Sequence, residues 1–111
     1  WHVPSDEEWT TLTTSLGGEA VAGGKMKETG TINWISPNLE ATNESGFTGL
    51  PGGCIDSNGS FGDIGVDGYW WSDLDFSSAD AWHRVLGYNY KNVVRTNSGK
   101  DNGFSIRCLR D

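Results

Sequence analysis

A few large aromatic rings must carry much of the hydrophobic core of this chain. Its 111 residues include six Trp, three Tyr and four Phe but a single Met, and each ring buries a large apolar area. The sixteen Gly predict many tight turns and few long helices, because glycine adopts turn conformations easily and weakens a helix. A chain of this length is expected to form one domain over residues 1–111, with one modest core.

A capping-box pattern marks the first helix. Ser5 is followed three residues later by Glu8, and this spacing lets each side chain bind the other's backbone amide. We expect a helix from about Asp6 to Leu16, ended by the glycine pair that follows it. A second, shorter helix is predicted over 19–26. The stripe that should face the core comprises Trp9, Leu12 and Leu16.

The rest of the chain divides into loops and strands. From Lys27 to Gly68 the composition turns to Gly, Asn, Ser, Thr and Pro, which predicts a long structured loop region. Four antiparallel strands are then predicted, at 69–74, 81–88, 93–96 and 104–109. Two N-terminal helices and a C-terminal antiparallel sheet define an α+β domain.

The predicted strand over 81–88 has two different faces. Its bulkier, even-numbered residues should face the core, which leaves the odd-numbered residues outward. Together with the following turn and strand, the outward side mixes aromatic, apolar and polar character, as binding surfaces do. We therefore expect substitutions on this side to be tolerated, unlike those at Trp82, Leu86 and Phe104. The candidate ligand-binding residues are His83, Val85, Tyr90, Asn92, Val94 and Thr96.

Three tryptophans admit a second interpretation. The rings of Trp70, Trp71 and Trp82 can form a platform on which sugars stack, because aromatic faces bind the apolar faces of sugars. A chain this short needs its large rings in the core, however, so we expect most of these rings to be buried.

The charge balance argues against nucleic acid and lipid as partners. Eight Lys plus Arg against fifteen Asp plus Glu give a net charge of −7, which disfavours binding to phosphates or anionic lipids. The sequence contains no run of eighteen apolar residues, so we expect no direct membrane insertion. Six of the basic residues lie in Ala81–Asp111, with only two acidic ones. This basic third either complements the acidic part inside the fold or forms a positive face for an acidic ligand.

Residues with catalytic or metal-binding chemistry are few. His2 and His83 are the only histidines, and neither has a nucleophile or carboxylate at a motif spacing, so we expect no enzymatic activity. Asp56 and Asn58 lie in an oxygen-rich loop that is either a calcium site or, as we rather expect, an Asx turn. No other metal or cofactor is expected.

The two cysteines leave two alternatives open. Cys54 and Cys108 can form one disulfide that closes a long loop, which contributes about 3 to 5 kcal/mol in an oxidising compartment. Otherwise they do not pair with each other.

Several motifs in a fixed order carry a family resemblance. They are Trp-His-Val-Pro-Ser-Asp-Glu-Glu-Trp at 1–9, Ala-Thr-Asn-Glu-Ser-Gly-Phe at 41–47, Leu-Pro-Gly-Gly at 50–53, Tyr-Trp-Trp-Ser at 69–72 and Gly-Phe-Ser-Ile-Arg-Cys-Leu-Arg-Asp at 103–111. Over nearly its whole length the chain resembles the Fibrobacter succinogenes major paralogous domain family. The resemblance implies a C-type-lectin-like fold and a secreted or lipid-anchored bacterial protein. It also implies a cysteine just before Trp1 as the partner of Cys108.

The sheet pattern and the resemblance together indicate a function. We expect a non-enzymatic ligand-recognition module of a bacterial surface or secreted protein, with a protein or carbohydrate ligand at the cell surface. The alternative is a structural or assembly module of a surface lipoprotein or fibre, without a discrete ligand. Because the chain begins at Trp1 without Met, we expect it to be a piece of a larger extracellular protein whose targeting signal has been removed.

Overall fold

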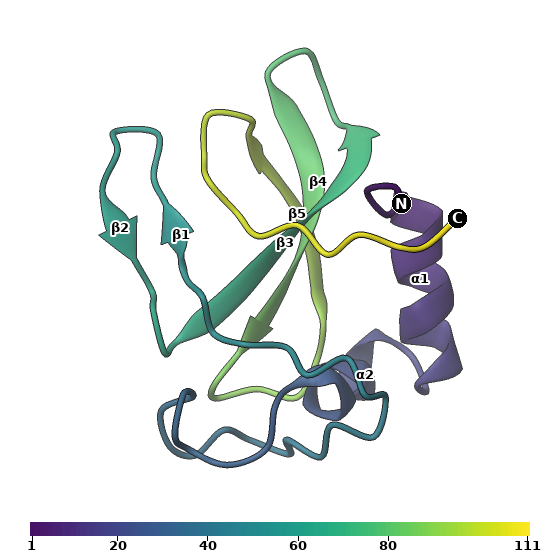
Figure 1. Ribbon diagram of the computed structural model, residues 1–111, viewed down its shortest axis with the longest axis vertical. Coiled ribbons are helices and arrows are strands. Elements are labelled where there is room, and N and C mark those ends of the chain that lie inside the picture. The colour runs from purple at the N-terminus through teal and green to yellow at the C-terminus, as the bar shows by residue number, and fades with distance from the viewer.

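The computed structural model describes residues 1–111, and its centre is a three-stranded antiparallel sheet (Figure 1). The sheet has the order β3 (Asp67–Asp75), β4 (Asp80–Gly87), β5 (Val94–Gly99), and a separate small hairpin pairs β1 (Cys54–Ile55) with β2 (Phe61–Gly62). Helices α1 (Asp6–Ser15) and α2 (Glu19–Met26) precede all strands. The predicted α+β class, with two helices and an antiparallel sheet, is confirmed.

Both predicted helices form where the sequence places them. At α1 the Ser5 hydroxyl accepts a hydrogen bond from the Glu8 amide at 3.1 Å, and the Glu8 carboxylate accepts one from the Ser5 amide at 2.8 Å. The helix ends at Ser15, one residue before the predicted end. In α2, Gly23 lies so close to the β4–β5 turn that an added Cβ would be 2.2 Å from the Asn92 carbonyl oxygen. The glycine that weakens α2 as a helix therefore lets the helix pack directly on that turn.

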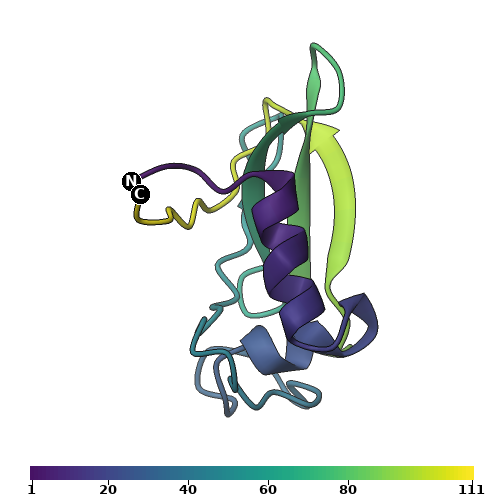
Figure 2. The ribbon, with the colours of Figure 1, turned by 90° about the vertical axis from the view of Figure 1, so that its right-hand side faces the viewer.

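Three of the four predicted strands are present, and the fourth, over 104–109, is wrong. Its residues form only single bridges: Ser105 pairs with β3 through Tyr69 and Trp71, and Leu109 pairs with His2. Because the partner changes along this segment, no continuous ladder forms. Figure 2 shows the result, with the two chain ends side by side at the edge of the molecule.

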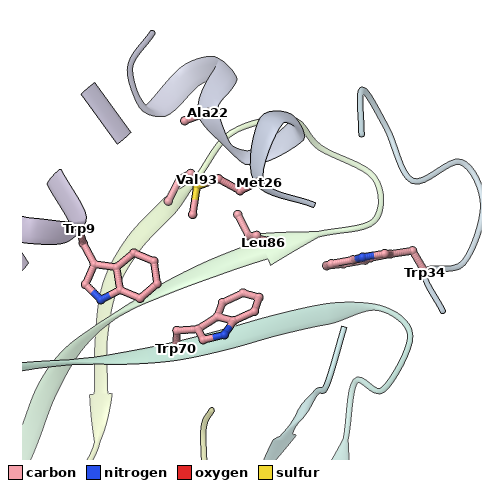
Figure 3. Packing of buried hydrophobic residues seen from close by; sticks show 7 residues of the cluster. All are labelled: Trp9, Ala22, Met26, Trp34, Trp70, Leu86 and Val93. Atoms are coloured by element: carbon pink, nitrogen blue, oxygen red, sulfur yellow. The ribbon is translucent and has the colours of Figure 1, made fainter. Parts of the chain in front are cut away.

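The core lies between the helices and the sheet (Figure 3). The half-buried Phe47 ring from the long loop region meets Trp9 of α1 and Trp70 of β3 edge-on, with ring centres 5.7 and 5.5 Å apart. Edge-to-face contacts of this kind add to the stabilisation from buried area. The aromatic core expected from composition therefore joins α1, the loop region and the sheet. Its buried members are Trp9, Ala22, Met26, Trp34, Trp70, Leu86 and Val93.

An ion-pair network ties α1 to the sheet. Asp6 binds the buried Arg84 guanidinium at 2.7 Å and Arg95 at 2.9 Å. Burial opposes ionisation of Asp6, but the Arg95 and Arg84 guanidiniums outweigh it and hold the pKa of that carboxyl below its usual value. Two basic residues of the C-terminal third thus complement the acidic part inside the fold, as one of the two alternatives predicted.

A single buried ammonium joins the long loop region to the sheet. Lys27 is completely buried at the end of α2, and its Nζ donates to the carbonyls of Leu39 (2.8 Å), Gly87 (2.8 Å) and Tyr90 (3.0 Å). It also lies 5.6 Å from the centre of the Trp34 ring. Burial lowers the pKa of Lys27 to about 8. The three carbonyl acceptors act in the opposite direction, because they favour the charged ammonium with its three N–H donors. One side chain therefore joins the long loop region to the end of β4 and to the β4–β5 turn.

We predict that Lys27→Met destabilises the protein by about 3 to 5 kcal/mol, because three buried carbonyls lose a charged donor that no apolar side chain replaces. Urea unfolding measures the change. The matched control is Lys25→Met, which loses one partly buried bond to the Leu16 carbonyl and should change stability by less than about 1.5 kcal/mol. Similar losses for the two variants would contradict a special role for Lys27.

Candidate functional site

The face of the sheet opposite the helices gathers side chains from all three strands. Strand register places Tyr69 beside Val85, and Val85 beside Val94; one row further, His83 lies between Trp71 and Thr96. Residues on alternate positions point to opposite faces, so Trp70, Arg84 and Leu86 belong to the helix side. These two rows are the base of the candidate site.

Aromatic rings cover this face. Phe104, from the segment after β5, stacks on Tyr69 with ring centres 4.9 Å apart and lies 4.4 Å from Trp71. The same Phe104 ring lies 4.6 Å from the imidazole of His83. Tyr69, Trp71 and Phe104 are half-buried and His83 is buried. We call these four side chains the aromatic face.

The prediction that His83 and Val85 are exposed is wrong. Their side chains do point away from the helices, but only 1% of His83 and 8% of Val85 is exposed to solvent. Tyr69, Trp71 and Phe104 cover His83, and Val85 lies between Tyr69 and Val94. The central strand is therefore buried on both faces, and a tolerance to substitution at these two positions is no longer expected.

The other predicted site residues divide into two groups. Tyr90, Val94 and Thr96 are half-buried, and the Tyr90 ring covers Gly87, where an added Cβ would lie 2.2 Å from the ring. These three residues border the aromatic face. Asn92 is separate, because its carbonyl packs against Gly23 of α2.

Sequence reasoning missed Tyr69 and Phe104 as members of this site, and it named Trp71 only as part of a possible sugar-stacking platform with Trp70 and Trp82. Tyr69 and Trp71 alternate with the buried Trp70, so the two-residue period was a signal that they share a face. The position of Phe104 had no such signal, because it depends on one bridge between Ser105 and β3. Trp82, expected in the core, is half-buried beneath the Arg95 guanidinium, 3.8 Å from its ring centre.

Carboxylates lie at one edge of the aromatic face. The Tyr69 hydroxyl donates to Asp63 at 2.7 Å and also lies 3.5 Å from Asp67, which is within 3.5 Å of the Tyr90 hydroxyl. Neither carboxylate forms an ion pair. Burial and the adjacent Asp63 raise the pKa of Asp67, and burial raises the pKa of Tyr90 to about 12. This edge can accept hydrogen bonds from hydroxyl or amino groups.

The two cysteines do not pair with each other. Both thiols are free: Cys54 lies 3.9 Å from Asp56 and 4.0 Å from Asp63, whereas Cys108 lies in the C-terminal segment beside Pro4 and Trp9. Burial, followed by the nearby Asp63 and Asp56 carboxylates, raises the pKa of the Cys54 thiol.

The loop at Asp56 and Asn58 has the geometry of an Asx turn. The Asn58 side-chain oxygen accepts from the Ser60 amide at 2.9 Å, and the Asp56 carbonyl accepts from the Gly59 amide at 2.8 Å. No group of three or more His, Cys, Asp or Glu side chains comes together in a way that could hold a metal ion.

Neither histidine has a carboxylate at a motif spacing in the sequence, but the fold brings two carboxylates to His2. Its ring nitrogens lie 2.9 Å from Glu8 and 2.8 Å from Asp111, because the ends of the chain pair with each other. Hydrogen bonds with Asp111 and Glu8 raise the pKa of His2. Both nitrogens are occupied, so His2 joins the chain ends. His83 Nδ1, in contrast, is buried without a partner.

These features define a small α+β domain with helices on one face of its sheet and half-exposed aromatic rings on the other. Neither helix is long and apolar enough to span a membrane. The chain belongs to the Fibrobacter succinogenes major domain family, whose model matches residues 1–110. The family resemblance read from the motifs is thus confirmed. No curated protein and no solved structure shows significant similarity to the chain.

The burial of His83 makes acid stability a test of this site. Burial, followed by the nearby Arg84 charge, lowers the pKa of His83 from 6.5 to about 4, so the folded protein resists a proton that the unfolded chain accepts. Above about pH 6.5 neutral His83 should therefore make its full contribution to the free energy of unfolding. That free energy should fall by about 3 kcal/mol as the pH falls from about 6.5 to 4.

Urea unfolding between pH 7 and pH 4 measures this loss. The comparison is His83→Phe, because a phenylalanine ring takes the place of the imidazole in the aromatic face and does not titrate. Carboxylates affect both proteins alike, so the difference between the two curves isolates His83. Parallel curves would show that His83 titrates normally and is not enclosed.

Proposed function

We propose that this domain is a non-enzymatic ligand-recognition module that binds carbohydrate on its aromatic face. The single observation that supports this most is that the half-exposed rings of Tyr69 and Trp71 both pack against Phe104. The centre of the Phe104 ring lies 4.9 Å from that of Tyr69 and 4.4 Å from that of Trp71. Rings held in this way present apolar surface with little loss of freedom on binding, and sugars have apolar faces that stack on them.

The surroundings of the rings support a ligand rich in hydroxyl groups. Asp63 and Asp67 have no basic partner, so their remaining lone pairs can accept hydrogen bonds at the edge of the face. Thr96 and the Tyr90 hydroxyl border the same face and add further polar contacts. A few polar groups around an apolar surface are typical of specific small-ligand sites.

We further propose a C-type-lectin-like fold for the whole of residues 1–111, and an extracellular or cell-surface location in a bacterium. The order of helices, long loop region and sheet supports the fold. The location is proposed from what the resemblance to the family implies, and the family model matches residues 1–110. The charge of −7 supports partners other than nucleic acid, and we propose no cofactor and no direct membrane insertion.

One observation favours the alternative of a structural or assembly module. Three apolar side chains outside the aromatic face are almost fully exposed: Ile32 (98%), Phe61 (83%) and Ile64 (80%). Association of copies would remove such side chains from water. In this alternative the domain self-associates and needs no discrete ligand.

A glycan array, followed by titration of the best hit, tests the proposal. Trp71→Ala should weaken binding at least about tenfold, because it removes one wall of the platform. The matched control is Phe61→Ala, which removes an exposed ring from the β1–β2 hairpin and should leave the affinity unchanged. Equal losses in the two variants, or a well-folded domain that binds no glycan, would contradict carbohydrate recognition on this face.

The assembly alternative makes a different prediction. If copies associate through the exposed apolar side chains, the sedimentation coefficient should rise with protein concentration, and Phe61→Ser should abolish that rise. Trp71→Ala should have no effect on it. We expect a concentration-independent monomer, and association that survives Phe61→Ser would exclude the hairpin as the contact.

A further inference from the structure

A groove of about 280 Å³ lies between α1, the loop around Phe47 and the C-terminal segment. It shares no residue with the aromatic face. The volume corresponds to roughly nine molecules of liquid water, slightly below the range of typical ligand pockets. Walls that are mainly apolar favour a ligand with an apolar body, because such a body leaves water when it binds. The apolar side chains that line the groove are Pro4, Trp9, Leu12, Phe47 and Leu109.

A guanidinium in the wall of the groove is held in place by Phe47. Arg107 donates through Nη1 to the Phe47 carbonyl at 2.8 Å, and its guanidinium carbon lies 4.5 Å from the centre of the Phe47 ring. Both residues line the groove. Two contacts with one neighbour fix the place of the positive charge, so the side chain loses little freedom when it binds an anion.

Arg107 has no anionic partner within the protein. It takes part in none of the ion pairs, although acidic residues outnumber basic ones by fifteen to eight. The bond to Phe47 is the only hydrogen bond that its guanidinium donates, and a guanidinium carries five N–H groups. Arg84 and Arg95, in contrast, share Asp6. Complementarity inside the fold therefore accounts for these two arginines and leaves Arg107 unexplained.

The one carboxylate that lines the groove is occupied elsewhere. The Glu8 carboxylate lies 2.9 Å from His2 Nε2 and accepts from the Ser5 amide at 2.8 Å. It forms no ion pair with Arg107. An anion that enters the groove therefore meets a positive charge that no side chain of the protein neutralises.

We propose that this groove is a second binding site, for a small monocarboxylate with an apolar body. The body lies against the apolar walls, and the carboxylate accepts hydrogen bonds from the free N–H groups of Arg107. The planar guanidinium matches the two oxygens of a carboxylate, which favours this group over a neutral one of the same shape. The site is independent of carbohydrate recognition on the aromatic face.

Three probes separate the charge from the apolar body. Hydrocinnamate carries both, hydrocinnamamide has the same shape without the charge, and acetate has the charge without the body. In ¹H–¹⁵N spectra of the whole chain, hydrocinnamate should cause saturable shifts of the Leu12, Phe47 and Leu109 amides. It should bind about three- to tenfold more tightly than hydrocinnamamide, the range expected for a carboxylate on a solvent-exposed guanidinium. Acetate should not saturate at the concentrations at which hydrocinnamate does.

Three variants locate the effect. Arg107→Gln removes the charge but keeps an amide donor for the Phe47 carbonyl, so hydrocinnamate and hydrocinnamamide should bind with nearly equal affinity. The matched control is Arg110→Gln, which removes the same charge from an exposed arginine outside the groove and should leave the ratio unchanged. Leu109→Ala shortens one apolar wall and should weaken both probes alike.

Should Arg107→Gln fail to fold, as judged by its melting, the ratio in the wild type and the effect of Leu109→Ala still decide. The proposal would be overturned if hydrocinnamate does not bind, or binds no more tightly than hydrocinnamamide. A preference that Arg107→Gln retains, or shifts confined to residues outside the groove, would overturn it as well.

Discussion

The buried ammonium of Lys27 is the contact on which the rest of the structure depends. The chain from Lys27 to Val66 has only four residues in paired strands, so most of its backbone groups need partners outside regular ladders. Lys27 supplies three donors from one atom, to Leu39 in the loop region, Gly87 at the end of β4 and Tyr90 in the β4–β5 turn. It thereby joins α2, the loop region and the sheet at one point. The core ring Trp34 packs beside it, which links the polar contact to the aromatic core.

With the loop region held in this way, the sheet acquires two different covered faces. The helix side is closed by the aromatic core and by Asp6, which binds Arg84 and Arg95. The other side is covered by the half-exposed rings of Tyr69, Trp71 and Phe104 and by Tyr90, which lies over Gly87. This asymmetry is the physical basis of the proposed function: one face carries stability, and the other offers aromatic surface beside carboxylates that have no basic partner.

Local patterns predicted the local elements well. The capping box at Ser5 and the stripe at Trp9 placed α1 within one residue, and the alternation in 81–88 correctly separated the residues on the two faces of β4. What alternation did not reveal is whether a face is covered. His83 and Val85 point away from the helices as predicted, yet they are buried, because rings from β3 and from the C-terminal segment lie over them. The fourth predicted strand failed for a related reason, since its apolar pattern reflects contacts with two different partners rather than one ladder.

By itself the sequence determined the helix boundaries, three strands, the class of fold and the family. Helix caps and hydrophobic periodicity act over a few residues, and the family motifs are read directly from the sequence. Only the tertiary structure decided which side chains form a site. Tyr69 and Phe104 are 35 positions apart, His2 and Asp111 are 109 apart, and Lys27 reaches a carbonyl 63 positions away. Such pairs meet through strand register and single bridges, and these depend on how all the elements pack at once.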